Sequence, residues 1–188
     1  MAPNPHYFIA LPLPQEIKDH IDTWKKEVKH KLPFKKWVYP ADYHITLFFL
    51  GGANNRQIQR VSENMEHLSL NYPSFSLDIT NAGWFGKPAE PRIFLVGAEG
   101  PHALYHLQRD VSIDCDTIGF AAEKRTYKPH ITVARKWNSK ESFQHAVKRL
   151  SSIPAVSWTA KEFVIYRTHL DRLPKYERVE TFTLRADK

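Results

Sequence analysis

Residues 43–51 read YHITLFFLG and residues 129–135 read PHITVAR, so the tripeptide His-Ile-Thr occurs twice in β-prone surroundings. In a strand, residues i and i+2 project from the same face. Each copy therefore presents an imidazole beside a hydroxyl, from His44 with Thr46 and from His130 with Thr132. Two such strands brought together would place two histidines and two threonines in one cleft. That combination suits acid–base chemistry on a bound anion.

Each copy is followed by the same predicted order of elements. After a short loop comes Asn-x-x-Gln at 54–57 or Asn-x-x-Glu at 138–141, patterns typical of helix N-caps. Apolar residues at helical spacing follow in both halves, namely Ile58, Val61, Met65 and Leu68 in the first and Phe143, Val147 and Leu150 in the second. We expect one domain over residues 1–188, built from two similar halves with pseudo-twofold symmetry.

The remaining elements follow from hydrophobic periodicity. Predicted strands cover residues 6–11, 75–79, 92–97, 161–167 and 177–184. Two further helices are predicted by apolar residues at helical spacing, from Ile17 to Val28 and from Leu104 to Val111. Residues 83–91 (GWFGKPAEP) contain two glycines and two prolines, so we expect a loop there.

Composition narrows the class of protein. A net charge of +7 over 188 residues favours a polyanionic partner. No apolar run approaches roughly 20 residues, so we expect no membrane insertion. The N-terminus has neither a basic leader nor a long apolar core, so we expect no signal peptide. Cys115 is the only cysteine, which excludes an internal disulfide and a cysteine-rich zinc site. These features predict a cytoplasmic protein.

Two other kinds of catalytic site find little support in the sequence. Two histidines make a poor metal site without further ligands, and threonine is not a usual zinc ligand. Cys115 lies between two aspartates, which oppose formation of a thiolate. There is also no G-x-S-x-G motif and no glycine-rich phosphate loop. We therefore expect a site without a metal ion, a cofactor or a covalent nucleophile.

The paired motifs and the blocks around them resemble the two-histidine (2H) phosphoesterase superfamily. Within it, the chain is most similar to the bacterial RNA 2′,3′-cyclic phosphodiesterases, long known as 2′-5′ RNA ligases. The resemblance covers nearly the whole chain, through the blocks FIALPLP, WVYPADYHITLFFLG, PRIFLVG, YKPHITVAR and EFVIYRTHL. It implies an α+β, bilobal fold in which antiparallel sheets face a central cleft and the helices lie outside.

The resemblance also implies a metal-independent reaction: hydrolysis of an RNA 3′-terminal 2′,3′-cyclic phosphate to a 2′-phosphate. His44 would protonate the departing 3′ oxygen and His130 would activate water. Thr46 and Thr132 would donate hydrogen bonds to the phosphate, and Arg135 would contact it. Simple strand alternation places Arg135 on the face opposite to His130, so this last role rests on the resemblance and implies a bend at the strand end.

Other residues have less specific roles. Phe48 continues the alternation from His44 and Thr46, so it either stacks on a base of the substrate or belongs to the core. A rim of basic residues for RNA phosphates is a second prediction, from Arg56, Lys87, Arg92 and Lys128. A denser basic stretch either guides RNA or forms a solvated face, and it comprises Lys25, Lys26, Lys29, Lys31, Lys35 and Lys36.

Alternative functions remain open at this point. The same four histidine and threonine residues would serve a 2′-5′ RNA ligase or another 2H cyclic nucleotide phosphodiesterase. An RNA-binding module with incidental activity is an alternative of another class, although a pure binder has no need for two titratable imidazoles. We expect a monomer that binds RNA or an oligonucleotide with a 2′,3′-cyclic phosphate end.

Overall fold

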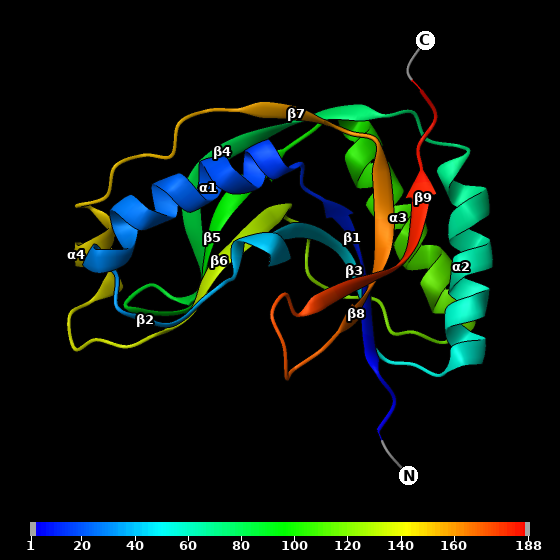
Figure 1. Ribbon diagram of the computed structural model, residues 1–188, viewed down its shortest axis with the longest axis horizontal. Helices are drawn as coiled ribbons and strands as arrows, with labels where there is room; N and C mark the ends of the chain where they lie inside the picture. Colours follow the sequence, from blue (N-terminus) through cyan, green and yellow to red (C-terminus); the bar gives the residue numbers. More distant parts are fainter. Residues whose placement is uncertain (1–2, 187–188) are drawn as a thin grey trace.

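The computed structural model describes residues 3–186 and shows two antiparallel sheets with helices on their outer sides (Figure 1). The first sheet has the strand order β3-β1-β8-β9, and the second has the order β2-β6-β5-β4-β7. The strands are β1 (His6–Pro12), β2 (Phe34–Trp37), β3 (His44–Gly52), β4 (Phe75–Lys87), β5 (Glu90–Glu99), β6 (His130–Trp137), β7 (Ser157–Ala160), β8 (Glu162–Thr168) and β9 (Tyr176–Thr183). This architecture confirms the predicted α+β class.

Four α-helices and two short 3-10 helices complete the described part of the chain. They are α1 (Gln15–Val28), η1 (Lys29–Lys31), η2 (Pro40–Asp42), α2 (Asn55–Ser69), α3 (His102–Ile118) and α4 (Phe143–Val147). In Figure 1, α2 and α3 flank the four-stranded sheet, whereas α1 and α4 lie on the side of the five-stranded sheet. We call the face that these helices leave uncovered the inner face of each sheet.

The outer faces of both sheets contribute to one continuous hydrophobic cluster, which includes Ile9 and Ile45 of the first sheet and Phe94 and Ile131 of the second. The part of this cluster that packs on the five-stranded sheet is rich in aromatic rings. There, Phe34 stacks on Phe94 with 5.5 Å between the ring centroids. A second, smaller cluster consists of Phe8, Ala10, Val164 and Tyr166. It covers the inner face of the four-stranded sheet, next to the first His-Ile-Thr motif.

The predicted loop at 83–91 is wrong, because residues 75–87 form one long strand that turns tightly into β5. The glycines and prolines are accommodated within this hairpin. Gly86 has a φ of 106° at a register shift, and a Cβ there would lie 2.9 Å from the backbone nitrogen of Arg92. The pairing of β4 with β5 therefore requires a glycine at position 86, and this glycine does not end the strand.

The N-cap prediction is correct in the first half and wrong in the second. The Asn54 side chain accepts a hydrogen bond from the backbone N–H of Gln57 (2.9 Å), and the Gln57 side chain accepts one from the backbone of Asn54 (3.1 Å). In the second half the helix begins only after Ser142, and the Glu141 carboxylate pairs with Arg149 instead. The helix ends at Val147, so Leu150 lies outside it.

No helix within residues 3–186 is long and apolar enough to cross a membrane.

The two asparagines offer a matched test of the capping box. Replacing Asn54 by alanine removes a side-chain acceptor from an otherwise unpaired N–H and should lower the free energy of unfolding by about 1 kcal/mol. Asn138→Ala removes no cap and should change it by less than about 0.5 kcal/mol. Urea unfolding followed by circular dichroism measures both. Equal values for the two variants would contradict the assignment.

Candidate active site

The first half-site is the start of β3, where His44 and Thr46 lie half-buried on the inner face. The His44 Nδ1–H donates to the backbone oxygen of Asp42 at 2.7 Å. In the neutral imidazole this leaves Nε2 as an acceptor, and it lies 3.1 Å from the Thr46 hydroxyl. The ring is therefore fixed through one nitrogen while the other points along the face toward the threonine.

The second half-site repeats this arrangement at the start of β6. The His130 Nδ1–H donates to the backbone oxygen of Lys128, again two residues earlier and again at 2.7 Å. Thr132 is half-buried on the same side of the strand. The two motifs thus hold their imidazoles in one local geometry, with Nδ1 on the backbone and Nε2 available for chemistry.

A β-bulge follows each motif and resets which residues face inward. In the pairing of β1 with β3, Ala10 lies opposite Thr46 but Ile9 lies opposite Phe48, so Leu47 is the extra residue. The pairing of β5 with β6 has the same interruption at Val133, because Leu95 lies opposite Thr132 and Phe94 lies opposite Ala134. Each bulge turns the chain so that the third residue after the threonine returns to the inner face.

The bulge in β6 explains how Arg135 reaches the site against simple alternation. Arg135 lies opposite Ile93 and shares the inner face with Thr132. Its charge acts on both histidines, since it lowers the pKa of His44 and of His130. Among the described residues 3–186, Arg135 makes no ion pair. It is therefore a free cation beside both imidazoles.

Because of the bulge in β3, the prediction that Phe48 stacks on a base is wrong, and the alternative that it belongs to the core is correct. Phe48 is 4% exposed and packs in the main hydrophobic cluster, whereas Phe49 is 70% exposed. Phe49 lies opposite Phe8 in the sheet, with 6.1 Å between the ring centroids. Phe8 in turn lies 4.7 Å from the His44 ring. The aromatic side chain available to a bound ligand beside the first half-site is thus Phe49.

Hydrogen bonds from neighbouring segments tie β3 to the second half of the chain. The Tyr127 hydroxyl, three residues before His130, donates to the backbone oxygen of Thr46 at 3.1 Å. The bulge residue Leu47 has its carbonyl satisfied by the side-chain amide of Gln108 in α3, at 3.2 Å. These bonds hold the first motif against the segment that leads into the second.

Burial keeps both histidines neutral in the ligand-free site. Burial, together with the smaller effects of the positive charges of Arg135, His130 and Lys18, lowers the pKa of His44 to about 4. The hydrogen bond to Asp42 opposes this shift without cancelling it. Burial and Arg135 also lower the pKa of His130, against the hydrogen bond to Lys128. A bound anion would offset these effects, since it favours the charged imidazole.

Three side chains at the site were missed by the sequence analysis. Tyr176 lies edge-on to His44 with 5.1 Å between ring centroids, and the charge of Arg135 acts on its pKa, which burial raises. The buried Asp42 carboxylate accepts hydrogen bonds from the backbone N–H groups of Lys175 (3.0 Å) and Tyr176 (3.2 Å). Phe85 lies edge-on to His130 at 4.8 Å. Phe85 was missed because its segment was expected to be a loop, and the other two carry no local sequence signal.

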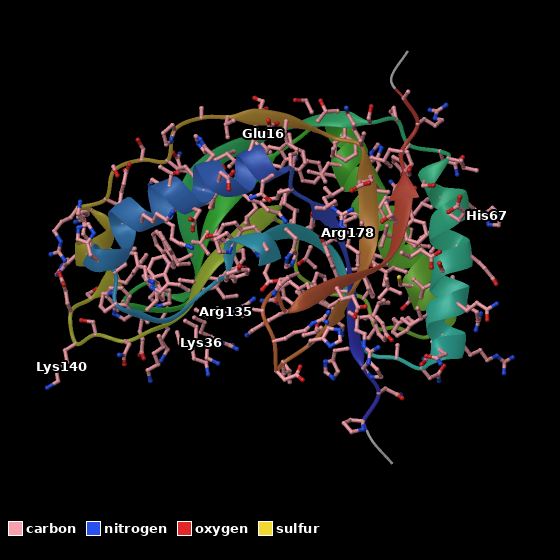
Figure 2. All side chains as sticks on the ribbon, in the orientation of Figure 1. Glu16, Lys36, His67, Arg135, Lys140 and Arg178 are labelled. Atoms are coloured by element: carbon pink, nitrogen blue, oxygen red, sulfur yellow. The ribbon has the colours of Figure 1, made fainter. Side chains whose placement is uncertain are left out.

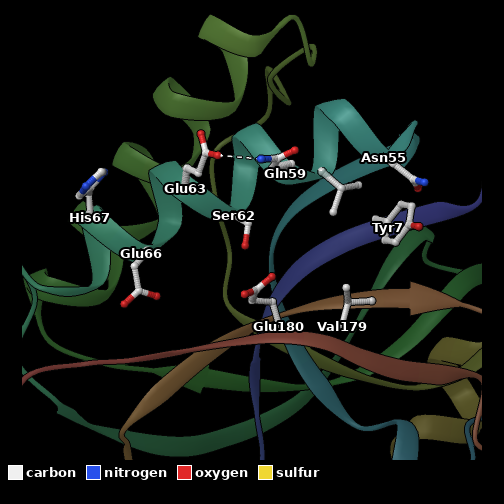
Figure 3. Close-up of a pocket in the computed structure, with 10 residues that line it drawn as sticks. Tyr7, Asn55, Gln59, Ser62, Glu63, Glu66, His67, Val179 and Glu180 are labelled. Atoms are coloured by element: carbon white, nitrogen blue, oxygen red, sulfur yellow. Dashed lines mark hydrogen bonds between the residues drawn. The ribbon is translucent and has the colours of Figure 1, made fainter.

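A separate hollow between α2 and β9 is unsuited to a polyanion (Figure 3). Glu63, Glu66 and Glu180 line it together with His67, so its charge is mostly negative. None of the residues predicted for catalysis lines it. The candidate site is therefore the inner face around the two motifs.

The chain is similar to known proteins over most of its length. The profile of the 2′-5′ RNA ligase superfamily matches residues 13–172. A Bacillus subtilis protein named RNA 2′,3′-cyclic phosphodiesterase is 36% identical, over 96% of this chain and 97% of its own length. A Geobacillus stearothermophilus protein of the same name is 40% identical over 95% of this chain, which spans 57% of that relative's length.

Solved structures agree with the fold. Escherichia coli LigT in complex with 3′-AMP has a TM-score of 0.81 and 22% sequence identity, covering 96% of this chain and 98% of LigT. The Thermus thermophilus protein TT0787 has a TM-score of 0.78 and 23% identity, covering 97% of this chain and all of that one. At these identities the likeness establishes the fold.

The two neighbouring phenylalanines allow the β3 bulge to be tested in solution. Phe48→Ala should lower the free energy of unfolding by about 3–5 kcal/mol, because it leaves a cavity in the core. Phe49→Ala removes an exposed ring and should change it by less than about 0.5 kcal/mol. Denaturant unfolding compares the two variants. A larger loss for Phe49→Ala would mean that the strand is not bulged at Leu47.

Proposed function

The chain belongs to the 2′-5′ RNA ligase superfamily, and from that membership we propose that it hydrolyses the 2′,3′-cyclic phosphate at the 3′ end of RNA, leaving a 2′-phosphate. The observation that carries this proposal is the repeated half-site. Two imidazoles held by the backbone through Nδ1, two threonine hydroxyls and the unpaired Arg135 share one region of the inner faces. The relatives from Bacillus and Geobacillus, named RNA 2′,3′-cyclic phosphodiesterase, support the substrate class.

Ring opening requires one proton to leave the attacking water and one to reach the departing oxygen. His130 takes a proton from water through Nε2 as the water oxygen bonds to phosphorus. His44, protonated when substrate binds, gives its proton to the 3′ oxygen as the P–O3′ bond breaks. The product has a 2′-phosphate and a free 3′ hydroxyl. Exchange with solvent then returns both imidazoles to their starting states. The division of roles follows the family resemblance.

Neutral and charged donors stabilise the transition state around the phosphorus. Thr46 donates its hydroxyl hydrogen to a non-bridging oxygen once it is released from Nε2 of His44, and Thr132 does the same from the second motif. Arg135 offsets the negative charge that gathers on these oxygens. No step in this scheme calls for a metal ion, and two imidazoles with two threonine hydroxyls are not a usual set of zinc ligands.

Phe49 replaces Phe48 as the residue proposed to stack on the terminal base. It is exposed, it adjoins the aromatic ring of Phe8, and it lies on the same face as the first motif. Base–aromatic stacking tolerates any sequence, because every base has a π-face. We further propose that the protein acts as a cytoplasmic monomer without a cofactor, since every group in the scheme comes from one chain.

The activity test uses an RNA oligonucleotide ending in a 2′,3′-cyclic phosphate, incubated with the protein in EDTA. We expect multiple turnovers to a 2′-phosphate product, identified by end-group analysis. His44→Ala and His130→Ala should each lower kcat about 10²- to 10⁴-fold, the usual contribution of a positioned acid or base. A 3′-phosphate product, a ligated product or loss of activity in EDTA would contradict the proposal.

The pH dependence tests the electrostatics of the histidines. The reaction needs one neutral and one protonated imidazole, and both free-enzyme pKa values are lowered, that of His44 to about 4. The profile of kcat/KM reports the free enzyme, so its optimum should lie below the ordinary histidine pKa of about 6.5. The kcat optimum should lie at higher pH, because the bound phosphate raises both values.

Arg135 provides the control for this profile. Arg135→Gln removes a positive charge that lowers both pKa values, so the kcat/KM optimum should move to higher pH even as the rate falls. Stopped-flow or discontinuous assays from pH 4 to 9 measure both profiles. A wild-type kcat/KM optimum above pH 7 would show that the imidazoles are not held neutral by burial.

A further inference from the structure

The inner face of the five-stranded sheet carries a row of side chains that crosses four strands at the level of Arg135. Phe85 in β4 lies opposite Ile93 in β5, and Ile93 lies opposite Arg135 in β6. Arg135 in turn lies opposite Lys36 in β2. Residues directly opposite one another in an antiparallel pair share a face. Lys36 therefore lies next to Arg135 on the inner face. It belongs to the edge strand β2, one strand farther from His130.

Lys36 has no acidic partner in the described part of the chain, unlike two other lysines of the same basic stretch. Lys25 and Lys26 both pair with Asp22 in α1, although they belong to the same basic stretch of the sequence. Within residues 3–186, no ion pair is made by Lys36 or Arg135. Lys36 is also exposed, and Figure 2 labels it beside Arg135. Two uncompensated cations therefore stand next to each other at the edge of the sheet.

The corresponding row on the four-stranded sheet has a different character. Phe49 lies opposite Phe8, Phe8 lies opposite Tyr166, and Tyr166 lies opposite Arg178. The cation at its end is neutralised, since Arg178 binds Glu162 at 2.6 Å. Beyond it, β9 adjoins the hollow lined by Glu63, Glu66 and Glu180. The cation of this row is thus already neutralised, whereas the row that ends at β2 offers two unpaired cations to an RNA backbone.

We propose that Lys36 binds the phosphodiester on the 5′ side of the terminal nucleoside, so that the RNA strand leaves the site over the edge strand β2. This proposal rests on the proposed function, in which Arg135 contacts the cyclic phosphate. Neighbouring strands lie about 4.8 Å apart, so the lysine side chain reaches outward to the next phosphate along the chain. The second cation gives the enzyme a preference for an oligonucleotide over a mononucleoside.

The test compares two substrates that share the reacting group. One is adenosine 2′,3′-cyclic phosphate, and the other is a short oligoadenylate ending in the same cyclic phosphate. For the wild type, kcat/KM should be higher for the oligoadenylate. Lys36→Gln should lower the ratio of the two kcat/KM values about 5-fold, and the salt dependence of the oligoadenylate KM should lose about 0.7 in log–log slope, the value for one phosphate contact to a single strand.

Lys35→Gln is the matched control, because Lys35 is exposed in the same strand but has no cross-strand partner in the register with β6. It should leave both the ratio and the slope at the wild-type values. Equal effects of the two variants, or an unchanged ratio in Lys36→Gln, would overturn the role of Lys36 while leaving the hydrolytic function intact. Failure of the wild type to hydrolyse either substrate would instead overturn the proposed function, and this inference with it.

Discussion

The β-bulge that follows each His-Ile-Thr motif is the constraint on which both the core and the site depend. Without the extra residue at Leu47, Phe48 would face inward beside Thr46, and the core would lose a buried ring. Without the extra residue at Val133, Arg135 would point into the core, where an unpaired guanidinium is very costly. Each bulge lets a strand present His and Thr inward, bury the next apolar pair, and then return one further side chain to the site.

Bulges leave backbone groups unpaired, and the fold supplies partners for them. The Leu47 carbonyl accepts a hydrogen bond from Gln108 in α3, so the helix that covers the first sheet also stabilises its interruption. The neighbouring carbonyl of Thr46 accepts one from Tyr127, close in sequence to His130. The segment that leads into the second motif is therefore hydrogen-bonded to the first motif. This bond couples the positions of the two imidazoles.

Much of this site can be predicted from the sequence, because its parts are local. His44 with Thr46 and His130 with Thr132 follow from a two-residue period, and the Asn54 cap follows from side-chain chemistry within one turn. What fails depends on long-range pairing. Simple alternation places Phe48 on the inner face. Nothing in the sequence LFFL indicates that β3 will form a bulge at Leu47 where it pairs with β1. The glycines at 83 and 86 suggest a loop until their strand partners are known. Lys36 gains its significance only from lying opposite Arg135, 99 positions away.

The two bulges also explain how similar halves can do different work. Phe49 and Arg135 occupy equivalent positions, each three residues beyond the threonine and each returned to the inner face by the bulge. One half thereby adds an exposed aromatic ring and the other a free cation.

A nucleotide has the complementary asymmetry, with an apolar base face on one side of the ribose and charged phosphates on the other. The first sheet, whose outer arginine is already paired, is suited to the base. The second sheet, where two cations remain unpaired, is suited to the phosphates. The backbone symmetry fixes the pair of histidines, and the side chain three positions beyond each threonine gives the site its direction.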